Sequence, residues 1–395
     1  MTQKKLILFM PSIEGGGVEK NFFIISNFLA KKFKKIFLIT TNKEVSHKLH
    51  NIEFVCPKSM FFQKGGRIRK YFICSFLLVK MLIKENNKFV FSFQANLFAI
   101  LISKIFNTKI LSRSNSSPSG WSRNIIKDMI YKIGFKLANT LIVNSTEFKN
   151  EIRKKFSVKS VCIYNPLNKD QILKESRKKV KKIFPKKYLK IIHVGRLVDQ
   201  KDQLTILKAI NELKHSYKIK LVLIGRGKNE NKIKNYIKLN NLSKLVKIFY
   251  SSNPFAYINQ AELFILSSRF EGLPNVLLES LTLKKFVISS SCPTGPKEIL
   301  LNGKGGLLFK PGNYKDLSKK IIFYINNKQK CKKMCNLAIK NLDKFDYKNG
   351  KMPGGPSDSV KQKQQSQQAQ QSQQAQQVVH LNADEMVGLS GKQRQ

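Results

Sequence analysis

Short apolar runs alternate with longer segments of helical apolar spacing between Lys5 and Val161. A short run bounded by polar residues is typical of a buried strand, and apolar residues three and four apart are typical of a helix that covers a sheet. The alternation therefore predicts a parallel sheet with helices on its faces. The runs are Leu6–Met10, Lys35–Thr40, Phe89–Phe93, Thr140–Asn144 and Ser160–Tyr164.

A second alternation of the same kind begins at Leu189 and ends in helices near Asp343. Between the two lies Asn168–Lys187, a polar, Lys-rich stretch that follows the turn signal Asn165-Pro166. We expect two α/β domains, residues 1–167 and 188–349, joined by a linker over 168–187. The second set of runs is Leu189–Arg196, Ile219–Gly227, Leu245–Tyr250, Glu262–Ser268 and Lys285–Ser290.

The composition changes abruptly after Gly350, where Gln, Ser and Ala replace the aromatic and aliphatic residues. Such a segment cannot bury enough apolar surface to offset its ordering entropy. Residues 350–395 are therefore predicted to be a disordered Gln-rich tail, and a foreign origin of this tail is an alternative.

The formal net charge of +49 is the main compositional anomaly in the 395 residues. A basic excess attracts nucleic acid, anionic membrane surfaces or phosphorylated substrates. The basic residues are mostly Lys and are scattered through every segment, so a general compositional bias explains them equally well. Charge alone leaves these partner classes open.

The six cysteines form no CxxC pair and have no nearby set of histidines, which indicates neither a zinc site nor a disulfide framework and fits a reducing cytoplasm. No transmembrane helix is predicted, because polar residues interrupt the most apolar stretches. The segments Arg67–Lys84 and Trp121–Lys136 mix basic and apolar residues at near-helical spacing. Each is interpreted as a covering helix with its apolar side against the sheet rather than as a membrane-binding helix.

The strongest local signal is Leu263–Ser280, where an apolar strand runs into a Gly-Leu-Pro turn that opens a helix. Ligands of open α/β sheets bind at such strand ends, and the free N–H groups of a helix N-terminus suit phosphate oxygens. Glu271 would lie at the strand exit and Glu279 about two helical turns further on. The two carboxylates are therefore expected to contact different parts of one ligand.

This Glu-x7-Glu element resembles the signature of the retaining GT-B glycosyltransferases of the large family four, also called glycosyl transferases group one. The resemblance extends over roughly Lys4–Asp346 and implies two Rossmann-like domains facing a cleft. Further matching segments are Ile13–Asn21, His193–Asp202, Leu221–Lys228 and Ser291–Phe309.

The resemblance implies a role for each charged residue of these segments. Glu271 would hydrogen-bond the transferred sugar and support its cationic anomeric centre, and Glu279 would hold the ribose hydroxyls. Arg196 and Lys201 would clamp the diphosphate and stabilise its growing negative charge in place of a metal. Neither a metal nor a cofactor is expected.

The remaining donor-binding residues implied by the resemblance are mostly small. Glycines let the backbone approach the donor without side-chain obstruction, and the N–H groups of Asn275 and Val276 would complete the phosphate cradle. The glycines and the neighbouring leucine are Gly16, Gly17, Gly195, Gly225, Gly272 and Leu273.

The first domain departs from the family pattern, which often places a histidine after a mid-domain strand. This chain has Leu111–Asn115 there, so Arg113 and Asn115 are the candidates for that role, with a solvated loop as the equal alternative. His193 lies within an apolar run and is interpreted as a packed core residue rather than an acid or base.

The resemblance implies transfer of a sugar, with a UDP-sugar as the expected donor, to a saccharide or polyprenyl-linked acceptor in surface-polysaccharide synthesis. The expected location is the cytoplasm, with an anionic membrane surface at its inner face as a partner. A nucleotide-sugar epimerase or another GT-B enzyme is the first alternative. A nucleic-acid-binding protein is the second, although no recognition module supports it and no nucleic acid is expected. The spacing of Gly15–Asn21 does not match the dinucleotide fingerprint of a dehydrogenase.

Overall fold

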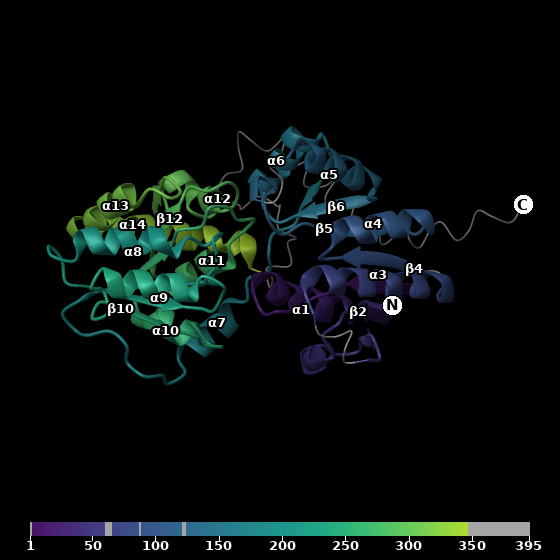
Figure 1. The fold of residues 1–395 in the computed structure, drawn as a ribbon, viewed down its shortest axis with the longest axis horizontal. Coiled ribbons are helices and arrows are strands. Elements are labelled where there is room, and N and C mark those ends of the chain that lie inside the picture. Colours follow the sequence, from purple (N-terminus) through teal and green to yellow (C-terminus); the bar gives the residue numbers. More distant parts are fainter. Residues whose placement is uncertain (1, 60–64, 87, 121–123, 347–395) are drawn as a thin grey trace, which may run out of the picture.

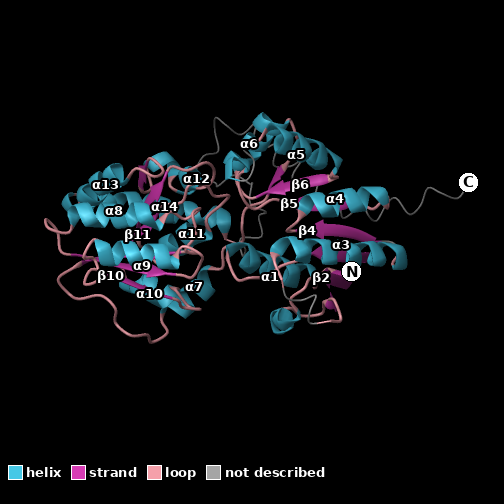
Figure 2. Ribbon diagram, viewed as in Figure 1, coloured by secondary structure: helices cyan, strands magenta, loops and turns pink. Residues whose placement is uncertain are grey.

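A computed structural model of the chain describes residues 2–59, 65–86, 88–120 and 124–346. Figure 1 shows two halves side by side, one coloured purple to blue and the other teal to yellow. Each half has strands between helices, as Figure 2 shows. The predicted Gln-rich tail, residues 350–395, lies outside the described residues.

The first half contains a parallel sheet of seven strands within the described residues, in the order β3-β2-β1-β4-β5-β6-β7. Its strands are continuous apolar runs, because a parallel sheet with helices on both faces buries both sides of each strand. The strands are β1 (Thr2–Phe9), β2 (Phe33–Ile39), β3 (Glu53–Val55), β4 (Lys88–Ser92), β5 (Ile110–Arg113), β6 (Thr140–Val143) and β7 (Val161–Cys162).

Helices cover both faces of this sheet. Phe22 of α1 packs with Leu6 and Leu8 on one face, whereas α3, α4, α5 and α6 bury the opposite face with residues such as Leu78 and Phe135. The helices of this half are α1 (Gly17–Leu29), α3 (Arg67–Lys84), α4 (Asn96–Ile105), α5 (Ile125–Leu137) and α6 (Thr146–Phe156), with 3-10 turns η1 (Lys43–Lys48) and η2 (Pro118–Gly120).

The second half contains a parallel sheet of six strands in the order β10-β9-β8-β11-β12-β13, enclosed by one continuous core cluster. The strands are β8 (Leu189–Val194), β9 (Ile219–Ile224), β10 (Val246–Phe249), β11 (Leu263–Leu266), β12 (Phe286–Ser290) and β13 (Leu307–Phe309). The helices are α8 (Gln203–Leu213), α9 (Glu230–Leu239), α10 (Phe255–Gln260), α11 (Asn275–Thr282), α12 (Pro296–Ile299), α13 (Tyr314–Asn326) and α14 (Lys328–Lys340), with turns η3 (Leu301–Gly303) and η4 (Asn341–Phe345).

The segment between the two sheets includes the helix α7 (Lys169–Ser176), which contacts α10 and α11 of the second half. Asn168 caps α7 by accepting a hydrogen bond from the Gln171 N–H group. Ile172 of α7 is buried in the core of the second half. This part of the predicted linker is therefore packed against that domain.

Both predicted parallel sheets are confirmed, and the segment Arg67–Lys84 is a covering helix, α3, as expected. Trp121 lies outside the described residues, and the rest of its predicted segment forms α5. Within the described part of the chain, every helix is too short or too polar to cross a bilayer.

Candidate active site

The strand order of the second sheet reverses between β8 and β11. The loops that leave these two neighbouring strands diverge, and the crevice between such loops is where open α/β sheets bind ligands. Arg196 and Lys201 lie in the loop after β8, and Glu271 lies in the loop after β11. The topology thus brings three of the predicted site residues to one crevice.

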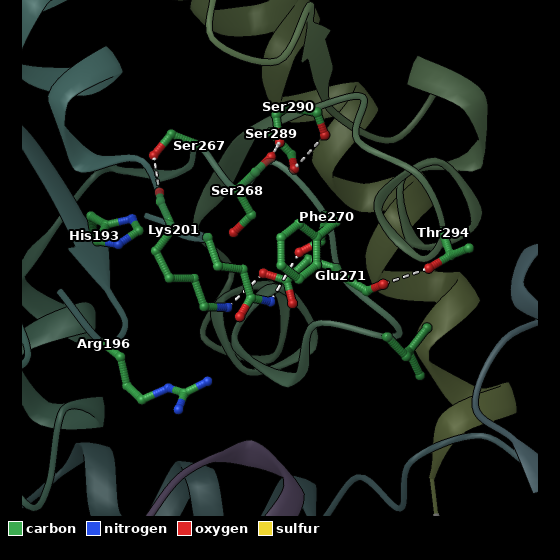
Figure 3. Close-up of polar contacts among 12 residues, drawn as sticks. His193, Arg196, Lys201, Ser267, Ser268, Phe270, Glu271, Ser289, Ser290 and Thr294 are labelled. Carbon is green, nitrogen blue, oxygen red and sulfur yellow. Dashed lines mark hydrogen bonds and ion pairs between the residues drawn. The ribbon is translucent and has the colours of Figure 1, made fainter. Parts of the chain in front are cut away.

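Hydrogen bonds hold these two loops together. The Gln200 side chain donates to the Phe270 carbonyl at 3.0 Å, and the Arg269 N–H group donates to the Gln200 carbonyl at 2.8 Å. The Ser267 hydroxyl donates to the Lys201 carbonyl at 2.7 Å, as Figure 3 shows. The backbone of Lys201 is therefore fixed relative to the loop that carries Glu271.

Lys201 and Glu271 form an ion pair in this crevice. The Lys201 Nζ atom lies 2.5 Å from Glu271 Oε1, and the two side chains are 15% and 9% exposed (Figure 3). Charges this far from water are tolerated because each neutralises the other. The pair presents an ammonium group, which suits an anion such as a phosphate, beside a carboxylate, which suits hydroxyl groups or a developing positive charge.

Arg196 is exposed at the same strand end. Its guanidinium has no hydrogen-bond or ion-pair partner among the described residues, and no dashed line reaches it in Figure 3. A planar guanidinium with free donors suits bidentate binding of phosphate. Arg196 is thus available to a ligand, whereas Lys201 is already held by the protein.

Glu279 lies on α11 and pairs with a residue of the first domain. Its Oε1 atom is 3.0 Å from the Nζ atom of Lys20 on α1, and the ammonium also lies 4.8 Å from the centroid of the Phe255 ring. These residues line a cavity of about 210 Å³ between the two domains. Lys20 therefore forms an ion pair with Glu279, the carboxylate that the family resemblance assigns to the ribose.

The start of α1, which follows the loop after β1, is held against the start of α11. The side-chain amide of Asn275 donates to the Gly17 carbonyl at 3.2 Å and to Asn21 Oδ1 at 3.0 Å. Gly16 precedes this contact and ends the loop before α1. The N–H groups of Asn275 and Val276 lie in the first turn of α11, where a helix leaves its donors without intrahelical partners.

Two of the predicted glycines, Gly195 and Gly225, let adjacent loops pack closely. A Cβ atom at Gly225 would lie 1.9 Å from the Gly195 carbonyl oxygen. Gly272 serves the contact between domains, because its Cβ atom would lie 2.3 Å from the carbonyl oxygen of Asn115. Leu273 is buried, and its carbonyl accepts from the Asn165 side chain at 3.0 Å.

Arg113 is 1% exposed, so the alternative of a solvated loop is wrong for this residue. It donates to the Ile163 carbonyl and to Asn165 Oδ1, each at 3.0 Å. Burial lowers the pKa of Arg113 to about 10, which leaves it charged at neutral pH. Asn165 in turn donates to Asn275 Oδ1 at 2.7 Å, so Arg113 supports a contact between the domains.

His193 is fully buried, which confirms its interpretation as a core residue. Its Nδ1 atom lies 2.9 Å from the Ile265 carbonyl, and its Nε2 atom lies 3.2 Å from the Gln203 side-chain amide. Burial lowers the pKa of His193 to about 4, so the imidazole is neutral at neutral pH.

Several residues that join the domains were missed by sequence reasoning. Glu298 accepts from the Tyr164 hydroxyl and, at 2.9 Å, from the Thr146 N–H group. Glu147 accepts from the Gly295 N–H group at 2.7 Å, and burial raises the pKa of Glu147. The family-like segment Ser291–Phe309 contains Glu298, but nothing in its pattern indicates a partner in the first domain.

The comparisons with known proteins agree with this site. A family model described as glycosyl transferases group 1 matches residues 174–341. An uncharacterized glycosyltransferase of Methanocaldococcus jannaschii is 30% identical over 289 residues, which cover 64% of this chain and 70% of that protein. The chain belongs to the glycosyl transferases group 1. The expected family and enzyme class are thereby confirmed.

This glycosyltransferase has a second informative relative in Campylobacter jejuni, the N-acetylgalactosamine-N,N'-diacetylbacillosaminyl-diphospho-undecaprenol 4-alpha-N-acetylgalactosaminyltransferase. The two are 27% identical over 328 residues, which cover 78% of this chain and 87% of the relative. A glycosyltransferase of amylovoran biosynthesis from Erwinia amylovora is 24% identical over 302 residues, 75% of this chain and 83% of the relative.

Solved structures confirm the GT-B fold of this glycosyltransferase. Anabaena HepE, in complex with UDP and glucose, has a TM-score of 0.68 at 16% identity, over 87% of this chain and 96% of that chain. Sucrose-phosphate synthase from Thermosynechococcus elongatus has a TM-score of 0.72 at 14% identity, over 96% of this chain and 100% of the other.

Proposed function

We propose that this glycosyltransferase moves a sugar from a UDP-sugar to a lipid-linked saccharide in surface-polysaccharide synthesis, with retention of the anomeric configuration. The observation that carries the proposal is the Lys201–Glu271 pair at the strand-order reversal of the second sheet. The undecaprenol-linked acceptor named for the Campylobacter jejuni relative and the UDP bound in HepE support the acceptor and donor classes.

In this proposal, Arg196 and Lys201 bind the diphosphate of the donor. The bond between the anomeric carbon and the phosphate oxygen breaks, and the acceptor hydroxyl oxygen forms the new bond to that carbon. The acceptor proton passes to the departing diphosphate, whose charge the two cations stabilise. Glu271 holds hydroxyls of the transferred sugar beside the cationic centre.

The donor shares Glu279 with Lys20. The Lys20 ammonium lies 3.0 Å from Glu279 Oε1, and the second carboxylate oxygen accepts from the ribose hydroxyls. Gly16, Gly17 and the N–H groups at the start of α11 give the phosphates close access to backbone donors. The enzyme works at the cytoplasmic face of the membrane, where its lipid-linked acceptor is held.

The test is transfer by the purified full-length chain from a panel of UDP-, GDP- and ADP-sugars to a polyprenyl-diphosphate-linked saccharide. Release of UDP that depends on the acceptor, with a glycosylated lipid as product, is the expected result. Glu271→Gln should lower this release about 10³-fold, and Glu230→Gln on α9 is the matched control. Acceptor-dependent release from a different nucleotide sugar would contradict the donor assignment. Absence of any lipid product would contradict the acceptor assignment.

A further inference from the structure

The helices α3, α4 and α5 form a continuous layer over one face of the first sheet. The helix α4 contacts both α3 and α5, and Figure 1 shows the same arrangement in the blue half of the molecule. Their inner sides bury Leu78, Ile100 and Phe135 against the strands. This inner stripe is sufficient to hold covering helices on a sheet.

The outer sides of the same helices carry a second apolar stripe, which we call the outer face. On α3, residues spaced four apart point outward, and Phe72 is 61% exposed. On α5, the outward residues follow the i, i+1, i+4, i+5, i+8 pattern, and Ile125 is 86% exposed. The outer face consists of Ile68, Phe72, Phe76, Ile83, Leu101, Ile105, Ile125, Ile126, Met129, Ile130 and Ile133.

An apolar surface of this kind needs an explanation. Single exposed apolar residues are ordinary, whereas a contiguous patch on adjacent helices marks a surface that meets an apolar partner. A helix that is apolar on two sides is usually buried on both. The inner side is covered by the sheet, so the outer side is the one that lacks a partner within the described chain.

The charges around the outer face indicate the kind of partner. Asp128 is the only acidic residue of α3, α4 and α5, whereas Lys80, Lys84, Lys104 and Lys127 are exposed among the apolar side chains. A Lys80 ammonium 4.5 Å from the centroid of the Phe76 ring shows how closely cation and apolar surface alternate. A second copy of this chain would oppose basic residues with basic residues, whereas anionic lipid neutralises them.

We propose that the outer face of α3, α4 and α5 docks on a bilayer that contains anionic phospholipid. The apolar side chains enter the boundary between headgroups and acyl chains, and the lysines contact the lipid phosphates. The covering-helix interpretation of Arg67–Lys84 and of the α5 segment holds for their inner sides, and the proposal adds a role for their outer sides. Binding has an apolar component that salt does not screen.

One edge of the outer face lies next to the active-site cleft. Arg67, at the start of α3, pairs with Glu14 in the loop after β1 at 2.7 Å. Ile125 and Ile126 begin α5, and in a parallel α/β domain the helix starts lie at the end where ligands bind. Docking would therefore hold the cleft beside the lipid that carries the acceptor, a consequence that rests on the proposed function.

The test is flotation of the full-length chain with vesicles of phosphatidylcholine alone or of phosphatidylcholine with phosphatidylglycerol. The variant Phe72→Ser/Phe76→Ser/Ile126→Ser/Ile130→Ser should lower partition into anionic vesicles by at least about tenfold, because four large apolar groups no longer leave water. Leu239→Ser is the matched control, since Leu239 is 81% exposed on the second domain and lies outside the outer face. Should the fourfold variant unfold, Ile126→Ser/Ile130→Ser alone should still lower partition severalfold.

The basic residues are tested separately. Lys127→Gln/Lys132→Gln/Lys136→Gln should weaken partition at low salt and have less effect at high salt, where charge is screened. Wild-type partition equal to that of the fourfold variant would overturn the proposal, as would complete release of the wild type by salt. A dimer that forms without lipid and that the fourfold variant abolishes would assign the outer face to a second copy instead. Vesicle binding is measured without donor or acceptor, so it stands or fails independently of sugar transfer.

Discussion

The helical layers of the two domains differ in what they present to the solvent. The covering helices α8, α9 and α13 of the second domain are apolar toward their sheet and polar outside, with Leu239 at the end of α9 as the exposed large apolar residue of these described helices. The layer α3–α5 of the first domain is apolar on both sides. Two domains of similar architecture thus differ in their covering helices, which have a polar outer side in the second domain and an apolar outer side in the first.

The contributions to the cleft also differ between the domains. The second domain supplies the charged groups Arg196, Lys201 and Glu271 on loops fixed at strand ends. The first domain supplies mainly backbone and amide contacts, together with Lys20. We propose that the second domain performs the donor chemistry and that the first domain positions the acceptor. The predictions below test this division.

The largest effect is expected from Glu271→Gln. The glutamine can still accept a hydrogen bond from Lys201, so the fold and nucleotide affinity should persist, whereas turnover should fall about 10³-fold through loss of the charge at the sugar. Turnover with saturating substrates and calorimetric titration with UDP measure the two quantities. If turnover and UDP affinity fell together by the same factor, Glu271 would not act in the transition state.

A smaller effect is expected from substitution of Lys201 and Arg196, the two cations at the candidate site of the second domain. Lys201→Met and Arg196→Met should each lower turnover about 10²-fold, because each removes one charge from the leaving diphosphate. Only Lys201→Met should also lower the melting temperature, since it leaves Glu271 nearly buried without its partner. Equal melting temperatures for the two variants would show that the ion pair contributes nothing to stability.

The contact between the domains is tested by Gly272→Ala. The added Cβ atom would lie 2.3 Å from the Asn115 carbonyl oxygen and should destabilise the contact between the domains by about 1–3 kcal/mol. The melting temperature and the turnover should both decrease. Gly66→Ala is the control, because a Cβ atom at Gly66 meets no atom within 4 Å. Similar unfolding temperatures for both variants would argue against a tight contact at Gly272.

The smallest effect on the isolated protein is expected from the outer face. Ile126→Ser/Ile130→Ser should change the free energy of unfolding by less than about 0.5 kcal/mol per site, because these side chains are exposed in the folded chain. Turnover with a short, water-soluble acceptor should equal that of Leu239→Ser. A marked loss of stability would show that the outer face is packed within the molecule rather than available to a membrane.

Much of the fold and part of the site could be predicted from the sequence. The apolar runs predicted most of the strands, because residues of a parallel sheet are buried on both faces, but no run was assigned to β3, β5 or β13. The family-like segments predicted that Glu271, Lys201 and Arg196 share one site, and the structure places them on loops from the neighbouring strands β8 and β11. The roles of these residues in donor binding and transfer stay predictions.

The contacts between domains could not be predicted in this way. Lys20 and Glu279 are separated by 259 positions, and Arg113 supports Asn165 from another strand end. A local pattern reports which residues favour burial or charge, whereas the partner of a charge depends on how distant segments meet. Arg113 therefore looked like a ligand-binding or solvated residue until packing showed it to be buried.

The sequence by itself determined the alternation of strands and helices, because local spacing decides which residues can share a buried face. It also contained the apolar residues of α3 and α5, but a helix with two apolar stripes can place either one against the sheet. Only the tertiary structure decided which stripe is buried and which is exposed, because the sheet and the adjacent helices accept one side of each helix. The other side of each helix faces outward, with its apolar residues next to lysines. In this respect the first domain differs from the second, whose covering helices are polar outside.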